Sequence, residues 1–283
     1  MQHHEMPIHI GKYTLHMRLT SGKFSSSYYI GIYKNTEGKE LFVKRWEGKR
    51  KNIAYKWLKN EAAIYRVLSN KQYNVSIRIP KFVDEIEDRN SLSLIVDHIK
   101  GEDISRQSVN KKIKTYQKIL SALAKSKKNN QYTRRPPLYW IGIVPIISLV
   151  AIIKNLKYWR IILRGLIYIM LHAMVIVQRK RRSLVHRDLN DNNVISNSHG
   201  TYLIDYELAI YADPMIDLAI LLLKNNSDSE FITRMKQSQF YAKTIKNKND
   251  TVSLITYMTI FSVYDLCFSS GLHTASIKHL GSI

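Results

Sequence analysis

The residues best suited to chemistry lie in one short stretch, between Ser183 and Ala219. The tripeptide His186-Arg187-Asp188 follows a short apolar run, Asn193 comes five residues after Asp188, and Asp205 ends the second of two strand-like segments joined by a polar turn. Such a hairpin brings Asp188, Asn193 and Asp205 to one end of itself. Phosphoryl transfer requires a carboxylate that orients the attacking hydroxyl, and an amide oxygen and a second carboxylate that hold magnesium. We therefore expect Asp188 to be the catalytic residue, and Asn193 and Asp205 to bind Mg2+.

Lys44 and Glu61, which lie much earlier in the chain, complete this set. Lys44 ends a predicted strand, and Glu61 lies on the otherwise inward-facing stripe of a helix predicted over residues 53–68. A lysine at a strand end is usually solvated, but an unpaired carboxylate on an inward stripe is costly. A pair between Glu61 and Lys44 would satisfy both groups and direct the ammonium at the α- and β-phosphates of ATP.

The order H-R-D-x-x-x-x-N followed by D-x-x resembles the catalytic segment of the protein-kinase-like superfamily. The runs Leu203 to Glu207, Asp213-Pro214 and Asp217-Leu218-Ala219 resemble the aminoglycoside phosphotransferase and choline/ethanolamine kinase group in particular. Asp188-Leu189-Asn190 with Asn193 also resembles lipopolysaccharide-core kinases that phosphorylate a Kdo sugar. The resemblance covers about residues 13–220 and leaves no room for the long activation segment of protein kinases.

This resemblance implies an α+β, bilobal protein-kinase-like fold, with an antiparallel-sheet N-lobe over residues 1–98 and a mainly helical C-lobe over residues 99–283. It implies an ATP-dependent phosphotransferase that uses Mg2+. His186 is then expected to be a structural hydrogen-bonding residue, and Asp217 to cap a helix and brace the catalytic loop. Glu207 is a weaker candidate for an additional metal ligand.

Two further segments are expected to hold the nucleotide. A turn between the first strands could bind phosphate oxygens through backbone N–H groups and hydroxyls, at Gly22, Ser25 and Ser26. Most such turns only join a hairpin, and this one is poor in glycine. A later apolar strand runs into a short link that resembles the adenine-binding hinge, with Asp97, His98 and Ile99 as its nucleotide-binding residues.

The chain is strongly basic, with 44 Lys and Arg against 22 Asp and Glu and a net charge of +22. Such a field attracts nucleotides, anionic membranes, phosphorylated glycans or nucleic acid. The lone Cys267 excludes an internal disulfide and fits a reducing compartment. Because no secretory signal is evident, we expect a cytoplasmic protein, with a peripheral position at the inner face of the membrane as an alternative.

The middle of the chain, residues 138–178, is unusually apolar. Its first run contains Pro145 and its second is interrupted by Arg164, so neither reaches the roughly 18 uninterrupted residues expected of a membrane-spanning helix. Kinase-like folds place a long buried helix before the catalytic loop, and we therefore expect a buried core helix from Trp159 to Gln178. Aromatic residues mixed with cations leave peripheral contact with an anionic membrane open as the alternative.

The acceptor is expected to be a hydroxyl of a small molecule or glycan. The basic surface favours an anionic or membrane-borne acceptor, such as a lipopolysaccharide-type or lipid-linked sugar. A catalytically silent kinase-like binding module at an anionic surface and a protein Ser/Thr kinase stay open as alternatives. No specific nucleic-acid partner is expected, because no recognition motif is present. The sequence does not indicate the oligomeric state.

Overall fold

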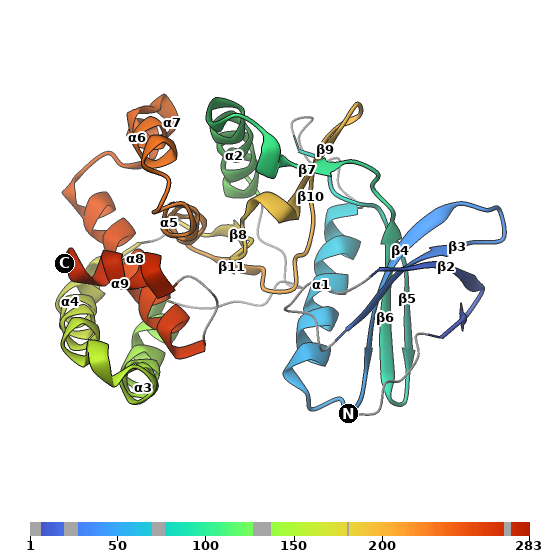
Figure 1. Ribbon diagram of the computed structural model, residues 1–283, viewed down its shortest axis with the longest axis horizontal. Helices are drawn as coiled ribbons and strands as arrows, with labels where there is room; N and C mark the ends of the chain where they lie inside the picture. Colours follow the sequence, from blue (N-terminus) through green and yellow to red (C-terminus); the bar gives the residue numbers. More distant parts are fainter. Residues whose placement is uncertain (1–6, 20–27, 70–76, 127–136, 180, 269–272) are drawn as a thin grey trace. The chain divides into compact units, whose positions relative to one another are not determined.

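The computed structural model describes residues 7–19, 28–69, 77–126, 137–179, 181–268 and 273–283, and its contacts divide the chain into two compact units (Figure 1). The first unit comprises Met1–Asp103 and Asn192–Ala209, and the second comprises Ile104–Asp191 and Ile210–Ile283. The first unit is a curled antiparallel sheet with one helix, and the second is mainly helical. The expected α+β architecture with a sheet lobe and a helical lobe is confirmed. The domain boundary after His98 stays a prediction.

The first unit is built on a six-stranded antiparallel sheet with the strand order β1-β2-β3-β4-β6-β5. Its strands are β1 (His9–Ile10), β2 (Tyr13–Leu19), β3 (Tyr29–Lys34), β4 (Glu40–Glu47), β5 (Phe82–Asp88) and β6 (Ser91–Asp97). The helix α1 (Ile53–Ser69) packs against β4, β5 and β6.

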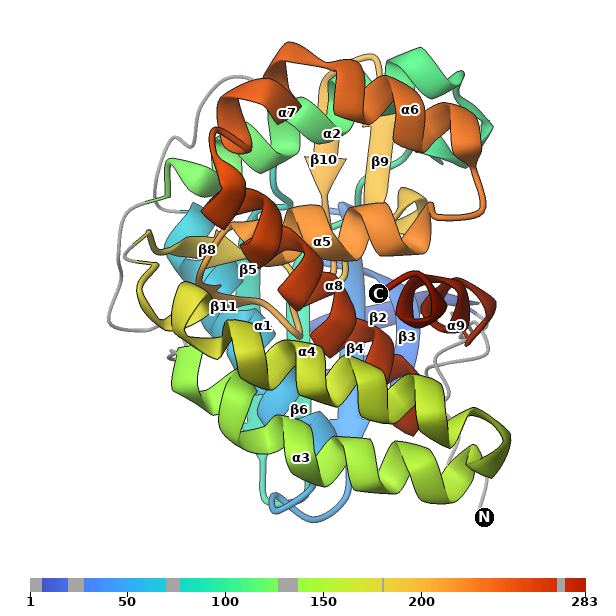
Figure 2. The same ribbon diagram turned by 90° about the vertical axis from the view of Figure 1, so that its left-hand side faces the viewer.

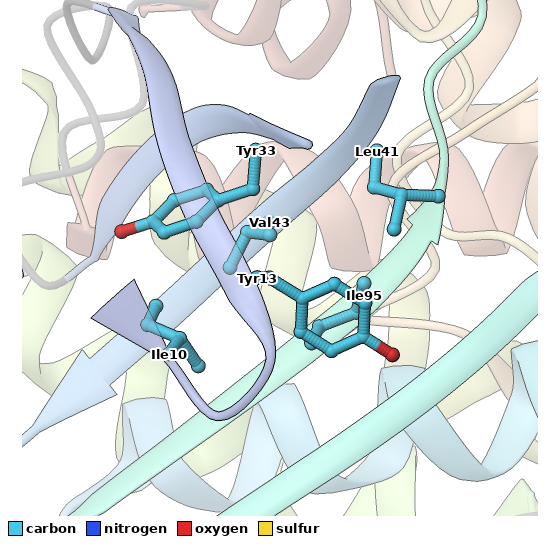
Figure 3. Close-up of a cluster of buried hydrophobic side chains, with 6 residues drawn as sticks. All are labelled: Ile10, Tyr13, Tyr33, Leu41, Val43 and Ile95. Carbon is cyan, nitrogen blue, oxygen red and sulfur yellow. The ribbon is translucent and has the colours of Figure 1, made fainter. Parts of the chain in front are cut away.

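The central strand β4 sends alternate side chains to opposite faces of this sheet. Leu41 and Val43 point into an apolar cluster, whereas Lys44 and Trp46 point to the side of α1, where the Trp46 ring meets Tyr55 edge to face at a centroid distance of 5.2 Å. Figure 3 shows the apolar cluster of Ile10, Tyr13, Tyr33, Leu41, Val43 and Ile95. Burial of each aliphatic side chain contributes about 1.5–3 kcal/mol. The cluster therefore fixes β4, and β4 in turn aims Lys44 at α1.

A second, three-stranded sheet completes the first unit in the order β10-β9-β7, and its strands are β7 (Glu102–Asp103), β9 (Val194–Asn197) and β10 (Gly200–Leu203). The backbone N–H of Ile204 donates to the carbonyl of Asn193 at 3.0 Å, which closes the open end of the β9–β10 hairpin. Asn193 and Asp205 therefore lie at the same end of the hairpin, as the sequence predicted. Gly101 must be a glycine, because a Cβ there would lie 2.7 Å from the carbonyl oxygen of Ser196.

The second unit contains most of the helices. In chain order its elements are η1 (Ile104–Arg106), α2 (Val109–Ala124), α3 (Pro137–Lys154), η2 (Leu156–Tyr158), α4 (Trp159–Val177), β8 (Ser183–Val185), β11 (Ile210–Ala212), α5 (Met215–Lys224), α6 (Ser229–Gln237), α7 (Gln239–Thr244), α8 (Lys248–Phe268) and α9 (His273–Gly281), and a short turn, η3 (Asp191–Asn193), links it to the β9–β10 hairpin. The helix α8 is mostly buried and packs against α3, α4, α5 and α9 (Figure 2). The strands β8 and β11 pair antiparallel; in the chain they lie just before His186 and a few residues after Asp205.

The expectation that Trp159–Gln178 forms a buried core helix is wrong for one face of that helix. Ile162, Gly165 and Ile169 are buried, but Leu171 is 75% exposed and Met174 is 62% exposed. The periodicity of a helix that is apolar on all sides does not indicate which sides are covered by neighbours.

The buried His279 on α9 predicts a pH dependence of stability. Its Nε2 lies 3.2 Å from Oγ1 of Thr259, and burial lowers its pKa from the usual 6.5 to about 4. Between these two pH values the unfolded chain binds a proton that the folded chain does not, so the free energy of unfolding should fall as the pH decreases from about 6.5 to about 4. Above pH 6.5 His279 should contribute no pH dependence.

Urea denaturation at several pH values should show this effect as a difference between the natural chain and His279→Gln, which cannot titrate. Over the whole window the natural chain should lose roughly 3 kcal/mol more than the variant. The same dependence of stability on pH in both proteins would contradict a buried, neutral His279.

Candidate functional site

The Lys44 ammonium is surrounded by three carboxylates in the first unit. Its Nζ lies 3.0 Å from Oε2 of Glu61, 2.9 Å from Oδ1 of Asp205 and 2.9 Å from Oε2 of Glu207. Lys44 and Glu61 are buried, whereas the side chains of Asp205 and Glu207 are 34% and 21% exposed. The pair between Lys44 and Glu61 predicted from the sequence is confirmed. We call these four residues the Lys44 cluster.

Glu61 connects the sheet to the turn after β10. Its Oε2 accepts from Lys44, and its Oε1 accepts from the backbone N–H of Tyr206 at 3.2 Å. One helical turn later, the hydroxyl of Tyr65 accepts from the backbone N–H of Asp205 at 3.2 Å. The α1 helix therefore holds both Lys44 and the backbone of the turn that carries Asp205.

Asp205 has a left-handed backbone conformation, with φ of 64°. For residues other than glycine this region is sparsely populated, and a surrounding structure must hold it in place. The bonds from Glu61 and Tyr65 to the adjacent N–H groups provide that hold. The conformation directs the Asp205 carboxylate to Lys44 instead of along the strand.

The Lys44 cluster has more negative than positive charge. Burial raises the pKa of Glu61 to about 7; Lys44 opposes this shift, while Asp205 and Glu207 add to it. Burial also raises the pKa of Glu207. Burial alone would lower the pKa of Lys44, but the three carboxylates outweigh it and hold that pKa well above its usual value. Lys44 is therefore a permanent cation, and the carboxylates it does not fully neutralise favour a second cation.

Asp205 and Glu207 are the members of this cluster that can bind a divalent metal ion, because both oxygens of Glu61 already accept hydrogen bonds, from Lys44 and from the backbone N–H of Tyr206. One carboxylate oxygen from each of Glu61, Asp205 and Glu207 lies within 4.8 Å of the others. Carboxylate and amide oxygens are the protein ligands that Mg2+ takes, together with several waters and substrate phosphates. Asp205 and Glu207 are partly exposed and therefore accessible to such an ion. Asn193 lies at the same end of the β9–β10 hairpin as Asp205.

Sequence reasoning missed two side chains that complete the cluster. The Tyr28 ring lies 4.6 Å from Nζ of Lys44, and its hydroxyl donates to the carbonyl of Ala54 at 2.9 Å. Nδ2 of Asn60 donates to the carbonyls of Glu207 and Ala209, at 3.2 and 2.9 Å. Tyr28 stands beside a second tyrosine at the start of β3, and no pattern in the sequence indicates which of the two faces Lys44.

The other predicted nucleotide-binding residues are not part of the Lys44 cluster. Asp97 ends β6 and pairs with Lys39 at 2.6 Å, and Nδ1 of His98 lies 3.4 Å from Oε2 of Glu40. His98 and Ile99 line an open hollow of about 610 Å3. Their role as an adenine-binding hinge stays a prediction. The predicted phosphate-binding residues, which are Gly22, Ser25 and Ser26, lie outside the described residues.

Asp188 lies in the second unit, where its side chain is half-buried and forms an ion pair with Lys224 at the end of α5. Its backbone N–H donates to Nδ1 of His186 at 3.3 Å. The buried His186 therefore supports the loop, which is the structural role expected from the sequence. Lys224 was not predicted, because it lies 36 residues further along the chain and carries no motif of its own.

Asp217 on α5 braces the same loop. Its Oδ2 accepts from the backbone N–H of His186 at 2.9 Å, and its Oδ1 accepts from that of Arg187 at 2.8 Å. Arg187 also has a left-handed backbone conformation, with φ of 66°. The expected bracing role is confirmed. The expected helix cap is wrong, because the N-cap position of α5 is Pro214 and Asp217 lies within the first turn.

A second brace comes from α2. Asp191, three residues after Asp188, accepts from the hydroxyl of Tyr116 at 2.5 Å and pairs with Nζ of Lys112 at 2.7 Å. The segment around the predicted catalytic residue Asp188 is therefore held from α2 and from α5. The basic run after α4 is partly structural too, since Arg179 pairs with Asp213 and Asp250 at 2.5 and 2.7 Å.

Removal of the Asp217 carboxylate should destabilise the fold. In Asp217→Ala two buried N–H groups lose their acceptor, which costs about 1–3 kcal/mol each, so the free energy of unfolding should fall by about 2–5 kcal/mol. Asp217→Asn keeps one acceptor oxygen and should lose about half as much. Denaturant unfolding measures both, with Glu37→Ala on an exposed turn as the control. Equal stability of Asp217→Ala and the control would contradict the bracing role.

Comparison with known proteins identifies the family of the chain and agrees with its fold. The family described as "Phosphotransferase enzyme family" matches residues 18–244. The search of curated proteins found no match. Among solved structures, a thermostable mutant of the aminoglycoside phosphotransferase APH(4)-Ia in a ternary complex with ADP and hygromycin B has a TM-score of 0.67 at 14% identity, over 94% of this chain and 90% of that one.

Two further solved structures share the fold. A putative fructosamine-3-kinase from Haemophilus somnus 129PT has a TM-score of 0.62 at 12% identity, over 95% of this chain and 92% of that one. The choline kinase LicA from Streptococcus pneumoniae has a TM-score of 0.63 at 16% identity, over 95% and 94%. The family match covers well over half of the residues, and this chain therefore belongs to the phosphotransferase enzyme family.

Proposed function

We propose that this phosphotransferase uses ATP and Mg2+ and moves the γ-phosphate of ATP to a hydroxyl of a small molecule or glycan. The Lys44 cluster carries this proposal. It combines a permanent cation, which can bind nucleotide phosphates, with half-exposed carboxylates that can bind a metal ion. Buried charges are costly unless they are paired, and one ammonium cannot neutralise three carboxylates. Stability alone therefore does not account for three carboxylates around one buried lysine.

The reacting groups have defined roles in this proposal. The acceptor's hydroxyl oxygen attacks the γ-phosphorus, the bond from that phosphorus to the β–γ bridging oxygen breaks, and ADP leaves with the electron pair. Asp188 accepts the proton of the hydroxyl. Lys44 binds the α- and β-phosphates, and Glu61 orients its ammonium. Bound on Asn193 and Asp205, Mg2+ would neutralise the charge that develops on the phosphate oxygens.

Chain connectivity supports joint action of Asp188 and the metal ligands. Asn193 is the fifth residue after Asp188, so the chain between them spans at most about 18 Å. The braces on Asp191 and on the backbone at His186 fix the first part of this segment, and the β9–β10 hairpin fixes its end.

For the acceptor, we propose an anionic sugar, of the lipopolysaccharide or lipid-linked type. The net charge of +22 supports it, because a basic surface raises the local concentration of anionic substrates and of nucleotides. With such an acceptor the enzyme would be cytoplasmic and would work at the inner face of the membrane. APH(4)-Ia, in its complex with hygromycin B, and the choline kinase LicA act on small molecules, which is consistent with a hydroxyl acceptor of that kind.

Magnesium-dependent ATP turnover by the purified chain tests the chemistry. Turnover should rise with one pool among aminoglycosides, choline and ethanolamine, sugars, lipopolysaccharide fragments and a test protein, and should stop with EDTA. Asp188→Asn should lower kcat by roughly 100- to 10,000-fold, the usual worth of a general base. Lys44→Met and Asp205→Asn should lower kcat by at least roughly 100-fold, because each removes electrostatic stabilisation of the transferred group.

Matched controls separate these effects from general damage. Lys118→Met on an exposed position of α2 and Glu37→Gln on an exposed turn make the same changes of charge and should leave turnover unchanged. Nucleotide binding without turnover in any pool would favour the catalytically silent alternative, and turnover with the test protein alone would favour a protein kinase. No nucleotide binding at all would refute the proposal.

A further inference from the structure

The helix α4 has an outward apolar face that no element of its unit covers in the described part of the chain. Leu163, Ile167, Met170, Leu171 and Met174 follow one another at helical spacing and are 38–75% exposed. Residues three and four apart lie on one side of a helix, so they form a continuous stripe. Scattered single apolar residues on a surface are ordinary, but a continuous patch marks an interaction site.

The neighbouring helix α3 extends this stripe into a wider surface. Ile146, Leu149, Val150 and Ile153 are 36–65% exposed, and α3 packs alongside α4 (Figure 2). Leu156, in the short connection between the two helices, is 68% exposed. We call the exposed apolar residues of α3, η2 and α4 the α3–α4 face.

The α3–α4 face is not an incomplete part of the hydrophobic core, because the other side of α4 is already packed. Ile162, Ile169 and Ile176 are buried, and α4 contacts both α8 and α9. A Cβ at Gly165 would lie 2.7 Å from Cδ2 of Leu280, so the helices are in close contact there. The unit therefore has its core without the outward residues, and they are free to contact something else.

Cations and aromatic rings flank this face at the connection between the two helices. Lys157 lies over the ring of Tyr158 at 5.2 Å, and Arg160 over the ring of Trp159 at 5.4 Å. Arg164, one turn further on, is exposed next to Leu163. Aromatic rings and long cationic side chains beside an apolar stripe are typical of segments that lie in the interface of an anionic membrane.

The positive charge of the chain is concentrated in the segment that carries this face. Between Ile104 and Arg187 there are 19 Lys and Arg and no Asp or Glu. The rest of the chain is nearly balanced, with 25 Lys and Arg against 22 Asp and Glu. The net charge of +22 is therefore a property of this segment and not of the composition as a whole.

We propose that the chain docks on anionic lipid bilayers through the α3–α4 face, with α3 and α4 lying in the plane of the membrane interface. The apolar residues would enter the boundary between headgroups and acyl chains, and Lys157, Arg160 and Arg164 would contact lipid phosphates. This goes beyond the proposed function and does not depend on nucleotide or acceptor. It supplies a means of reaching an acceptor that is carried on lipid.

Docking in the plane fits the structure better than insertion across the bilayer. Leu156–Val177 is long and apolar enough to span a membrane, and 22% of its apolar 18-residue stretch is buried. To span, however, α4 would have to separate from α8, against which it packs. The polar side chains Thr256, Thr259 and Ser262 of α8 are buried and would lose this cover. A second copy of the chain is also disfavoured as the occupant, because it would bring two segments of the same strong positive charge together.

Flotation of the full chain with lipid vesicles, without nucleotide, tests the proposal. The chain should bind vesicles of 70% phosphatidylcholine and 30% phosphatidylglycerol, should bind pure phosphatidylcholine at least 10-fold more weakly, and should be released by high salt. The triple variant Lys157→Gln/Arg160→Gln/Arg164→Gln should bind roughly 100-fold more weakly, from the usual worth of a cation at an anionic surface. The double variant Ile167→Gln/Leu171→Gln should bind the same anionic vesicles at least 10-fold more weakly, because it removes apolar surface that enters the interface.

Matched variants with the same chemical changes elsewhere are the controls. Lys111→Gln/Lys114→Gln/Lys118→Gln removes three exposed cations from α2, and Met17→Gln/Ile53→Gln removes two exposed apolar residues from the first unit. Both should change binding by less than about 5-fold. Equal losses in the α2 variant and in the Lys157 variant would overturn the proposal, because binding would then follow net charge and not this face.

Three other outcomes would also overturn it. They are no binding to anionic vesicles, bound protein that resists extraction by salt and alkali as a spanning helix does, and a dimer in solution that Ile167→Gln/Leu171→Gln dissociates. ATP turnover with a soluble acceptor, measured on the same proteins, keeps the two proposals apart. If the natural chain turns over ATP but does not bind anionic vesicles, only the docking is refuted. If it binds the vesicles but shows no turnover, only the proposed function is refuted.

Discussion

The buried carboxylate of Glu61 is the constraint on which the described site depends. One of its oxygens holds Lys44 and the other holds the backbone N–H of Tyr206, so a single side chain links the central strand of the sheet to the turn after β10. Burial makes this carboxylate expensive, and its pKa rises to about 7. A chain that keeps so costly a group in its interior must satisfy both oxygens, and here each oxygen does a separate job. Without Glu61, Lys44 would lose its aim and the Asp205 turn would lose one of its two anchors.

The rest of the first unit can be understood as support for that arrangement. The apolar cluster of Figure 3 fixes β4, and the alternation of β4 then places Lys44 on the face that α1 covers. The β9–β10 hairpin returns the chain to the same helix, where Tyr65 accepts from Asp205. Asp205 and Arg187 are the two non-glycine residues with positive φ in the described part of the chain, and each has neighbours that bond to its own or an adjacent N–H group. Local strain is thus kept where binding and chemistry are expected, and hydrogen bonds from buried acceptors offset it.

The sequence was sufficient to predict a contact wherever a local pattern of residues encodes it. The hairpin and the pair of Lys44 with Glu61 follow from spacing and from the cost of an unpaired charge in the interior, whereas the brace from Asp217 was implied by the family resemblance. It was insufficient for contacts that depend on tertiary packing, such as Tyr28 over Lys44 or Lys224 beside Asp188. Tyr28 is one of two adjacent tyrosines, and Lys224 is one of 44 cations, so nothing local distinguishes either. The outward face of α4 was mistaken for core for the same reason, since apolar composition does not indicate which neighbours are present.

The uneven placement of charge along the chain determines which groups its cations can bind. Within a segment that has no acidic residue, a cation can pair only with groups from elsewhere in the chain or outside it. Lys112 and Arg179 use the first option, through Asp191, Asp213 and Asp250, and these pairs lie within the second unit. The 22 acidic groups of the chain also face the 25 cations outside this segment, so they cannot satisfy all 19 as well, and the surplus next to an apolar surface is available to anions in solution or in a bilayer. The Lys44 cluster has the opposite imbalance, with three carboxylates for one ammonium, and can take a cation instead. A protein that is basic as a whole and acidic at one buried point is suited to bind a polyanion together with its metal ion.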